Sequence, residues 1–324
     1  MSSNVSRRDF IAGGVAGVGL TSLGTTGGPA PAEAAEAMPK RPLGQTGEMA
    51  SLFAFGAGSR YATILEDEET AERIIHRAIE LGVSYFDTAY AYGNKQLSQK
   101  RYGWYLTPTY RNQIFLTNKS NQRTSDEFMR EFDESLENLK TDKIDLMYFH
   151  GVDEMKDLDT IMGKGGALEA MRRVVDQKAV RFIGMTGHRN ADAFIKAIDE
   201  IGLDVVMFPI NAAREQELIT RVLPYAQKKG VGVMAMKTTA QDNLIGKGGA
   251  KAPELVRYAM SMPVAGAVVG IPSMEVLESC CEIARNFTPM GNQEKAILEK
   301  KVVSAHYDGS LYYLCQGYRD GEVV

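Results

Sequence analysis

The sequence predicts an α/β protein, a (β/α)8 TIM barrel with a short C-terminal helical extension. From residue 41 onward, short apolar segments alternate with segments of helical periodicity, and eight apolar segments are strand candidates. The length of 324 residues leaves room for one barrel of roughly 250 residues. An open doubly wound sheet also alternates, but it normally has fewer strands and a glycine-rich turn after the first one. Residues 55–59 supply only two of the three glycines of that turn.

The expected strands are short apolar runs bounded by turn residues, at 52–55, 83–86, 114–117, 144–149, 181–185, 205–208, 231–236 and 265–269. Between them, apolar residues three and four positions apart predict amphipathic helices. The first expected helix covers residues 68–81, ends at Leu81-Gly82, and carries Ala71, Ile74, Ile75 and Ala78 on one face. Further helices are expected near 128–139, 168–175, 192–200, 215–227 and 253–260.

The chain divides into an N-terminal segment (1–37), the barrel (38–285) and a C-terminal extension (286–324). Ser6-Arg7-Arg8-Asp9-Phe10 precedes a glycine-rich apolar run that is too short to span a bilayer, and Ala35-Glu36-Ala37 is typical of a cleavage site. This order resembles a twin-arginine (Tat) export signal. It predicts the Tat translocase as a partner during export, a periplasmic location and no stable membrane span after processing. The alternative is a disordered tail with a chance arginine pair.

Composition narrows the class of function. The chain is 44% hydrophobic and 24% charged, with a formal net charge of −4 and no dense basic run, which argues against a nucleic-acid partner. Cys280, Cys281 and Cys315 lack the spacing of zinc or redox sites, and three thiols cannot hold a four-cysteine cluster. We therefore expect no metal site and interpret the cysteines as buried structural thiols.

Polar residues follow three consecutive expected strands at their C-terminal ends: Asp87, Lys119 and His150. Alone, a histidine there is more often structural and a lysine more often solvated. Parallel neighbouring strands would bring all three to one mouth of the barrel, where barrel enzymes build their active sites. Two phenols, Tyr90 and Tyr92, follow Asp87 in a loop.

At these residues the chain resembles the aldo-keto reductase family. Phe86-Asp87-Thr88-Ala89-Tyr90-Ala91-Tyr92-Gly93 is similar to the family motif, in which Asp and Tyr are five apart, and Lys119 and His150 match its lysine and histidine. The resemblance covers about residues 40–285. It implies an oxidoreductase that interconverts an aldehyde or ketone with an alcohol by hydride transfer. It also implies Tyr92 as the general acid, Lys119 and Asp87 as the pair that lowers its pKa, and His150 as the group that orients the carbonyl.

The chemistry of these side chains agrees with those roles. A free phenol has a pKa of about 10, so it releases a proton at neutral pH only when a nearby cation stabilises the phenolate. Lys119 can supply that cation, Asp87 can hold the ammonium in a partly buried site, and a neutral His150 can donate a hydrogen bond to the reacting oxygen. Tyr90 is the rival phenol, and only Tyr92 has the family spacing from Asp87.

The resemblance further implies NADP or NAD, extended across the barrel mouth. Candidate cofactor residues follow three strands: Thr186 and Gly187, then Met236 and Lys237, and finally the helix start with Gly270, Ile271, Pro272 and Ser273, whose free amides favour phosphate. Met207 and Met236 stand where the family commonly has a glutamine and an aromatic ring. No Lys or Arg accompanies Ser273, so the choice between NADP and NAD stays open.

Tyr61, Trp104 and His188 are expected to line an aromatic entrance for a small-molecule carbonyl or alcohol substrate, although core or surface aromatics would give the same pattern. Rim loops are expected at 151–166, 238–250 and from 286 onward, with the tyrosine-rich end folding over the barrel mouth. Two other functions stay open: a non-catalytic dinucleotide-binding sensor or regulatory protein on the same scaffold, and a lyase that uses Lys119 as a Schiff base.

Overall fold

The computed structural model describes residues 37–65, 67–214, 217–304, 308–315, 317–318 and 320. The expected export signal therefore lies outside the described residues, except for its last position. Within the described part of the chain, no helix has both the length and the apolar character needed to cross a bilayer.

Eight parallel strands close into a barrel, because the last strand pairs with both its predecessor and the first strand of the barrel. This confirms the predicted TIM barrel, and each expected strand overlaps an observed one. The barrel strands are β3 (Phe53–Gly56), β4 (Tyr85–Asp87), β5 (Phe115–Ser120), β6 (Ile144–Phe149), β7 (Val180–Thr186), β8 (Val205–Pro209), β9 (Gly232–Met236) and β10 (Gly266–Gly270).

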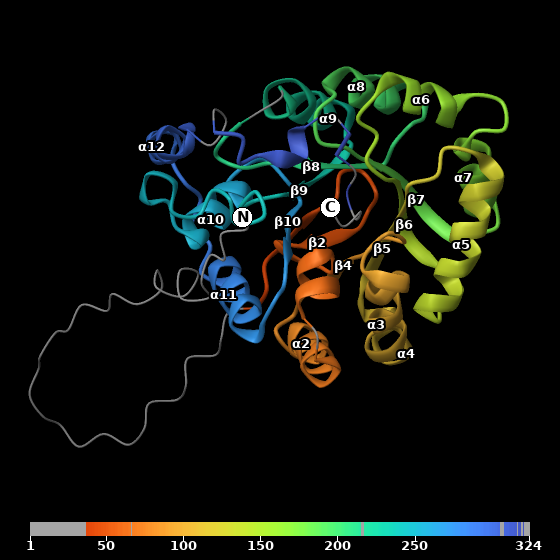
Figure 1. Ribbon diagram of the computed structural model, residues 1–324, viewed down its shortest axis with the longest axis horizontal. Coiled ribbons are helices and arrows are strands. Elements are labelled where there is room, and N and C mark those ends of the chain that lie inside the picture. The colour runs from red at the N-terminus through yellow and green to blue at the C-terminus, as the bar shows by residue number, and fades with distance from the viewer. Residues whose placement is uncertain are drawn as a thin grey trace, which may run out of the picture.

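Helices surround the strands on the outside (Figure 1). They are α2 (Glu68–Glu80), α3 (Leu97–Tyr105), α4 (Thr107–Tyr110), α5 (Ser125–Leu139), α6 (Met155–Met162), α7 (Ala167–Asp176), α8 (Ala191–Glu200), α9 (Leu223–Lys229), α10 (Ala252–Met260), α11 (Met274–Arg285) and α12 (Asn292–Val302). Shorter helical turns lie at Arg60–Ile64, Asn94–Gln96, Arg111–Gln113, Leu218–Val222, Lys247–Gly249 and Tyr312–Leu314. The expected loop at 151–166 is partly wrong, because α6 occupies its centre.

Helix α2 shows how the sequence sets an element's limits. The Asp67 side chain accepts a hydrogen bond from the Thr70 amide at 2.9 Å, which caps the first turn. The four apolar residues predicted for its inner face are all buried. The helix ends before Gly82, whose φ of +82° favours glycine.

The core has two layers at the barrel, and a third apolar cluster joins α10, α12 and the C-terminal segment through Leu255, Leu298 and Tyr313. Inside the barrel, aromatic and sulfur-containing side chains fill the space, and the Tyr85 and Tyr148 hydroxyls lie 2.8 Å apart. Tyr85 also stacks on Phe115, with ring centroids 5.4 Å apart. Met207 belongs to this inner layer and is buried. A larger apolar layer lies between the strands and the helices.

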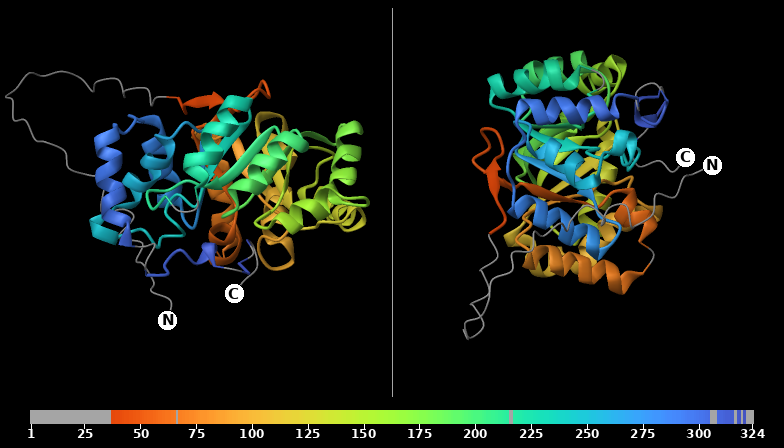
Figure 2. Two further views of the ribbon diagram at one scale, coloured as in Figure 1. Left: turned by 90° about the horizontal axis from the view of Figure 1, so that it is seen from above. Right: turned by 90° about the vertical axis from the view of Figure 1, so that its left-hand side faces the viewer.

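A hairpin covers the N-terminal end of the barrel. Its strands β1 (Lys40–Pro42) and β2 (Met49–Ser51) pair antiparallel, and the Gln45 amide donates to the Gly230 carbonyl, just before β9, at 2.9 Å. Gly44, in the turn of the hairpin, has a φ of +59°, and a Cβ there would lie 2.3 Å from the Gly232 nitrogen. Figure 2 shows the hairpin at one end of the barrel and the C-terminal segment at the opposite end.

The cysteines divide into two kinds. Cys280 and Cys281 are buried on α11, which confirms the expectation for them. Cys315 is exposed, so the expectation of a buried thiol is wrong there. Its segment runs across the outside of the barrel end, where its carbonyl accepts a hydrogen bond from Arg189.

Candidate active site

A buried ion pair lies at the C-terminal ends of β4 and β5. The Lys119 Nζ donates to Asp87 Oδ2 at 2.5 Å and to the Thr88 carbonyl at 2.9 Å. Asp87 pairs with Thr117 in the strand register, and the Thr117 hydroxyl donates to Asp87 Oδ1 at 2.7 Å. Lys119 follows Thr117 by two residues, so the two side chains face the same side of the sheet. Strand pairing therefore brings the ammonium to the carboxylate.

His150 and Tyr92 complete the cluster that the sequence predicts. His150 follows β6, where its amide donates to the Ser120 carbonyl at 2.9 Å. Its ring meets the Tyr92 ring edge-on, with centroids 5.6 Å apart, and the Lys119 Nζ lies 4.8 Å from the centroid of the Tyr92 ring. The structure thus brings Asp87, Tyr92, Lys119 and His150 together, and all four are buried.

A fifth residue, Asp320, enters this cluster from the C-terminal tail, which here means the described residues 308–315, 317–318 and 320. Its Oδ2 lies 3.1 Å from the Tyr92 hydroxyl and 3.3 Å from His150 Nε2. Its Oδ1 accepts hydrogen bonds from Lys237 Nζ at 2.8 Å and from the Tyr318 hydroxyl at 2.8 Å. Sequence reasoning missed Asp320, which is 170 residues from His150, and the tyrosine-rich end was the only signal for it.

Burial decides the charge of the imidazole. Burial lowers the pKa of His150 to about 4, although the hydrogen bond to Asp320 acts in the opposite direction. His150 is therefore neutral at pH 7 and donates to the carboxylate through Nε2–H. Burial acts to raise the pKa of Asp320, but Lys237 and the hydrogen bond from His150 hold that pKa well below its usual value. Asp320 is ionised.

The pKa of Tyr92 differs from the expectation. Burial raises it well above the usual phenol value, and the negative charges of Asp320 and Asp87 raise it further. The pKa of Tyr92 is therefore not lowered while Asp320 is in place, and the effect of Lys119 on it stays a prediction. The ammonium is paired with Asp87 and lies against the phenol ring. With Asp320 in place, Tyr92 keeps its proton.

Tyr90, the rival phenol, points elsewhere. Its hydroxyl donates to Glu134 on α5. Burial and this hydrogen bond raise the pKa of Tyr90 to about 12. Tyr90 therefore lies next to an acid on the helix layer, whereas Tyr92 lies with Lys119 and His150.

The candidate cofactor residues lie around the same barrel end. Thr186 Oγ1 accepts from the Gly151 amide at 2.9 Å, and a Cβ at Gly187 would lie 2.8 Å from the Val152 carbonyl oxygen. Met236 is buried with the inner core layer, and Lys237 follows it with a φ of +54°.

The third candidate group precedes α11. Ser273 is the N-cap of α11 and accepts from the Val276 amide at 3.5 Å, as its position after Gly270, Ile271 and Pro272 suggests. Sequence reasoning found no basic residue beside Ser273. The structure places Arg60, from the segment after β3, beside Gly270, where a Cβ would lie 3.0 Å from its side chain. Arg60 forms an ion pair with Asp242 at 2.9 Å.

Two of the expected substrate residues do not face the cluster. Tyr61 is fully buried, packs against Phe55 and donates its hydroxyl to the Ala71 carbonyl at 3.0 Å, so it is a core residue. Trp104 is 43% exposed on α3, beside Tyr105. Tyr61 and Trp104 therefore do not form the expected aromatic entrance.

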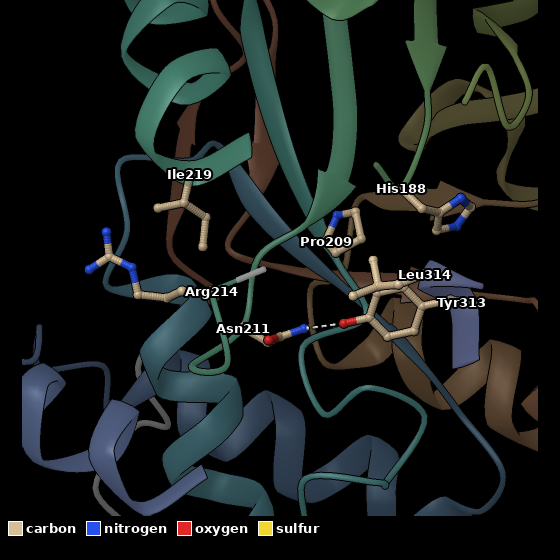
Figure 3. Close-up of a pocket in the computed structure, with 7 residues that line it drawn as sticks. All are labelled: His188, Pro209, Asn211, Arg214, Ile219, Tyr313 and Leu314. Carbon is tan, nitrogen blue, oxygen red and sulfur yellow. Dashed lines mark hydrogen bonds between the residues drawn. The ribbon is translucent and has the colours of Figure 1, made fainter. Parts of the chain in front are cut away.

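His188 lies beside the tail. Its Nδ1 is 3.0 Å from Asp153 Oδ2, and its ring meets Tyr318 edge-on at 5.2 Å. It also lines a narrow pocket with Pro209, Ile219, Leu314 and others (Figure 3). In this pocket Asn211 Nδ2 donates to the Tyr313 hydroxyl at 2.9 Å. The C-terminal tail thus forms one wall of this pocket.

Comparison with known proteins gives the family. Residues 55–254 match the model of the aldo/keto reductase family. The chain belongs to this family. Its relatives include L-galactose dehydrogenase from Arabidopsis thaliana, 29% identical over 222 residues, a match that covers 64% of this chain and 67% of that protein. D-threo-aldose 1-dehydrogenase from Pseudomonas sp is 29% identical over 213 residues, covering 56% of this chain and 63% of that protein.

The fold agrees with solved members of the aldo/keto reductase family. The holo form of AKR11C1 from Bacillus halodurans superposes with a TM-score of 0.67 at 23% identity, covering 82% of this chain and 96% of that chain. Family and relatives together indicate an oxidoreductase.

Aldo/keto reductases generally use NAD(P)H, and the residues of this chain fit such an anionic group. Lys237 already binds a carboxylate, that of Asp320, at 2.8 Å, so its ammonium is placed to hold an anion. The N-terminus of α11, with Glu275 as the only acidic residue of its first turn, offers backbone amides to a phosphate.

Proposed function

We propose that this aldo/keto reductase is an NAD(P)-dependent enzyme that interconverts an aldehyde or ketone with the alcohol, with Tyr92 as the proton donor. One observation carries the proposal. The Tyr92 hydroxyl and His150 Nε2 both lie within hydrogen-bonding distance of a single oxygen atom, Asp320 Oδ2, beside the buried pair of Asp87 and Lys119. A substrate carbonyl oxygen at that position would accept the same two hydrogen bonds.

Each side chain then has one task. Neutral His150 donates through Nε2–H and orients the carbonyl, and Tyr92 gives its proton to the oxygen as negative charge develops there. The ammonium of Lys119 stabilises the phenolate left behind, and Asp87 keeps that ammonium charged in its buried position. In the direction of alcohol oxidation, the same phenolate takes the proton back.

The bound dinucleotide would supply the hydride, which no side chain can donate. We propose that Lys237 and the amides at the start of α11 hold its phosphates, with Thr186 and Gly187 near its other end. Arg60, beside Gly270, is a basic candidate for a 2′-phosphate. Measured affinities for NADP and NAD, compared between the natural protein and Arg60→Gln, test this assignment.

The names of two relatives support a proposal for the substrate class. Two of them are named as dehydrogenases of L-galactose and of D-threo-aldoses. We therefore propose a small sugar as the substrate, which would lose hydride from C1 and a proton from the C1 hydroxyl of its cyclic form. A panel of aldoses, simple aldehydes and ketones, followed through the absorbance of the reduced nicotinamide, tests this class.

The proton donor is tested by a matched pair of substitutions. Tyr92→Phe should lower kcat by about 10²–10⁴-fold, because a positioned general acid contributes about that factor. Tyr90→Phe removes a phenol two residues away that contacts Glu134, and it should retain most activity. Undiminished turnover by Tyr92→Phe would remove the assignment. A natural protein that binds the dinucleotide but turns over nothing on the panel would favour the sensor or regulatory alternative.

We also propose that the chain is exported through the Tat pathway and acts in the periplasm. The support is the order of features in residues 1–37: the arginine pair, the short apolar run and the small-residue stretch.

A further inference from the structure

The C-terminal tail returns to the barrel mouth through a series of contacts. Asp308 pairs with Lys247, and the Tyr313 hydroxyl accepts from Asn211 at 2.9 Å. Near its end, the Tyr318 hydroxyl accepts from Lys237 Nζ at 3.0 Å. These contacts join the tail to the segments that follow β8 and β9, at the end of the barrel where Tyr92 and His150 lie.

The carboxylate of Asp320 uses the donors that the proposed reaction needs. Its Oδ2 takes the hydrogen bonds of the Tyr92 hydroxyl and His150 Nε2, and its Oδ1 takes the ammonium of Lys237. One short side chain therefore occupies the proposed position of the reacting oxygen. It also pairs with Lys237, the cation that we assign to a cofactor phosphate. Asp320 itself is only 8% exposed.

We propose that Asp320 is an intramolecular carboxylate ligand of the site formed by Tyr92, His150 and Lys237, and that its carboxylate must leave before substrate and dinucleotide bind. This inference rests on the proposed function for the identity of the competing ligands. The carboxylate site itself is defined by the contacts alone.

The balance of charge explains why the site accepts this carboxylate and how it can be displaced. Lys119 is already neutralised by Asp87, and Lys237 is neutralised by Asp320. Departure of the tail leaves the ammonium of Lys237 without that partner and free to bind another anion. A phosphate group is such an anion, so dinucleotide binding and tail release favour one another.

This coupling has a measurable size. When only a fraction of the molecules has an open site, the apparent dissociation constant rises by the reciprocal of that fraction. Asp320→Ala removes both oxygens and should raise the apparent affinity for the dinucleotide by about tenfold or more if the closed form dominates. Asp320→Asn keeps an acceptor for Tyr92 and His150 but loses the charge, and it should give an intermediate gain.

The matched control is Asp308→Asn, which makes the same change of charge in the same tail at a residue that pairs with Lys247, away from the cluster. Affinities of the full chain and the three variants are measured by fluorescence titration with NADPH and NADH. A gain in Asp320→Ala that is absent from Asp308→Asn supports the inference. Equal affinity in all proteins, or a loss in Asp320→Ala, overturns it.

A second measurement needs neither turnover nor cofactor. Acetate has the carboxylate of the aspartate side chain, so it should fill the site that Asp320→Ala vacates and raise the Tm of this variant relative to chloride at equal ionic strength. The natural protein should show no such shift, because its own carboxylate is in place. Stabilisation of both proteins, or of neither, contradicts the inference.

The dinucleotide titration and the acetate measurement together distinguish a failure of the proposed function from a failure of this inference. If no protein binds a dinucleotide while acetate still stabilises only Asp320→Ala, the proposed function is wrong and the carboxylate site stands. If all proteins bind the dinucleotide with equal affinity and reduce carbonyls, the function stands and the competition is wrong.

Discussion

His150 lies almost entirely out of contact with water, and this burial controls its charge. Burial lowers its pKa from 6.5 to about 4 in the folded protein. The imidazole therefore stays an uncharged donor at any pH where the enzyme is expected to work. The same shift links folding to pH, because an unfolded chain protonates the ring at a higher pH than the folded one.

This linkage predicts an acid sensitivity. Between pH 6.5 and about 4 the unfolded state binds more protons at His150 than the folded state, so the free energy of unfolding falls as the pH falls through this window. The contribution of His150 is about 3 kcal/mol over the window, from roughly 1.4 kcal/mol per pKa unit. Urea denaturation of the natural protein and of His150→Asn at several pH values measures it.

His150→Asn should flatten the dependence of stability on pH, whereas His76→Asn, a change on α2 outside the cluster, should leave it as in the natural protein. Equal slopes for the natural protein and His150→Asn would show that the imidazole is not the group responsible.

Helices α3 and α5 meet behind the strands that carry Asp87 and Lys119. At the crossing, a Cβ at Gly103 would lie 1.9 Å from the Asn138 backbone oxygen, so only glycine fits. The neighbouring Tyr102 hydroxyl donates to the Asp87 carbonyl at 3.2 Å. The packing of α3 against α5 therefore holds the end of β4, and with it the carboxylate of Asp87, in place.

The tightness of this crossing gives a test at the level of the element. Gly103→Ala should destabilise the protein by about 1–3 kcal/mol, because the helices must separate to admit the methyl group. Gly291→Ala is the control, since nothing lies within 4 Å of a Cβ at that position. Urea denaturation compares the two. A similar small effect for both would mean that α3 shifts without strain.

In the described part of the chain, the hairpin β1–β2 lies at one end of the barrel and the tail at the other (Figure 2). We propose export through the Tat pathway from the order of features in residues 1–37. Replacing both Arg7 and Arg8 by Lys should therefore hold most of the protein in the cytoplasm of a Tat-competent bacterium. Cell fractionation measures this, and a host without the Tat translocase is the control.

If the double replacement leaves the fractionation unchanged, or if the natural chain stays in the cytoplasm of the Tat-competent host, residues 1–37 do not act as a Tat signal. The experiment is independent of catalysis, because it follows the protein rather than its activity.

The order of elements was predictable because it depends on local periodicity. The strand expected at 144–149 coincides with β6. Its sequence is a short, mostly apolar run, and all of its residues are buried. Asp87, Lys119 and His150 were also predictable as a group, because strand ends meet at one mouth of a parallel barrel. Nothing comparable marks the helix α6, which lies within a glycine-rich segment.

Interactions across long stretches of chain were not predictable in the same way. Tyr61 was expected at an aromatic entrance to the substrate site. Its hydroxyl instead donates a hydrogen bond to the Ala71 carbonyl inside the core. Asp320 is an ordinary acidic residue by sequence, and only its position against Tyr92, His150 and Lys237 gives it meaning. Burial, together with the negative charges of Asp320 and Asp87, raises the pKa of Tyr92, opposite to the expected shift.

The exposed thiol of Cys315 provides a single attachment point for a label. Burial raises the pKa of Cys280 and raises the pKa of Cys281 to about 12, so a maleimide at neutral pH should react with Cys315 alone. The labelled position lies five residues before Asp320 in the chain. A dye or spin probe there would follow the proposed release of Asp320 in real time without any engineered cysteine.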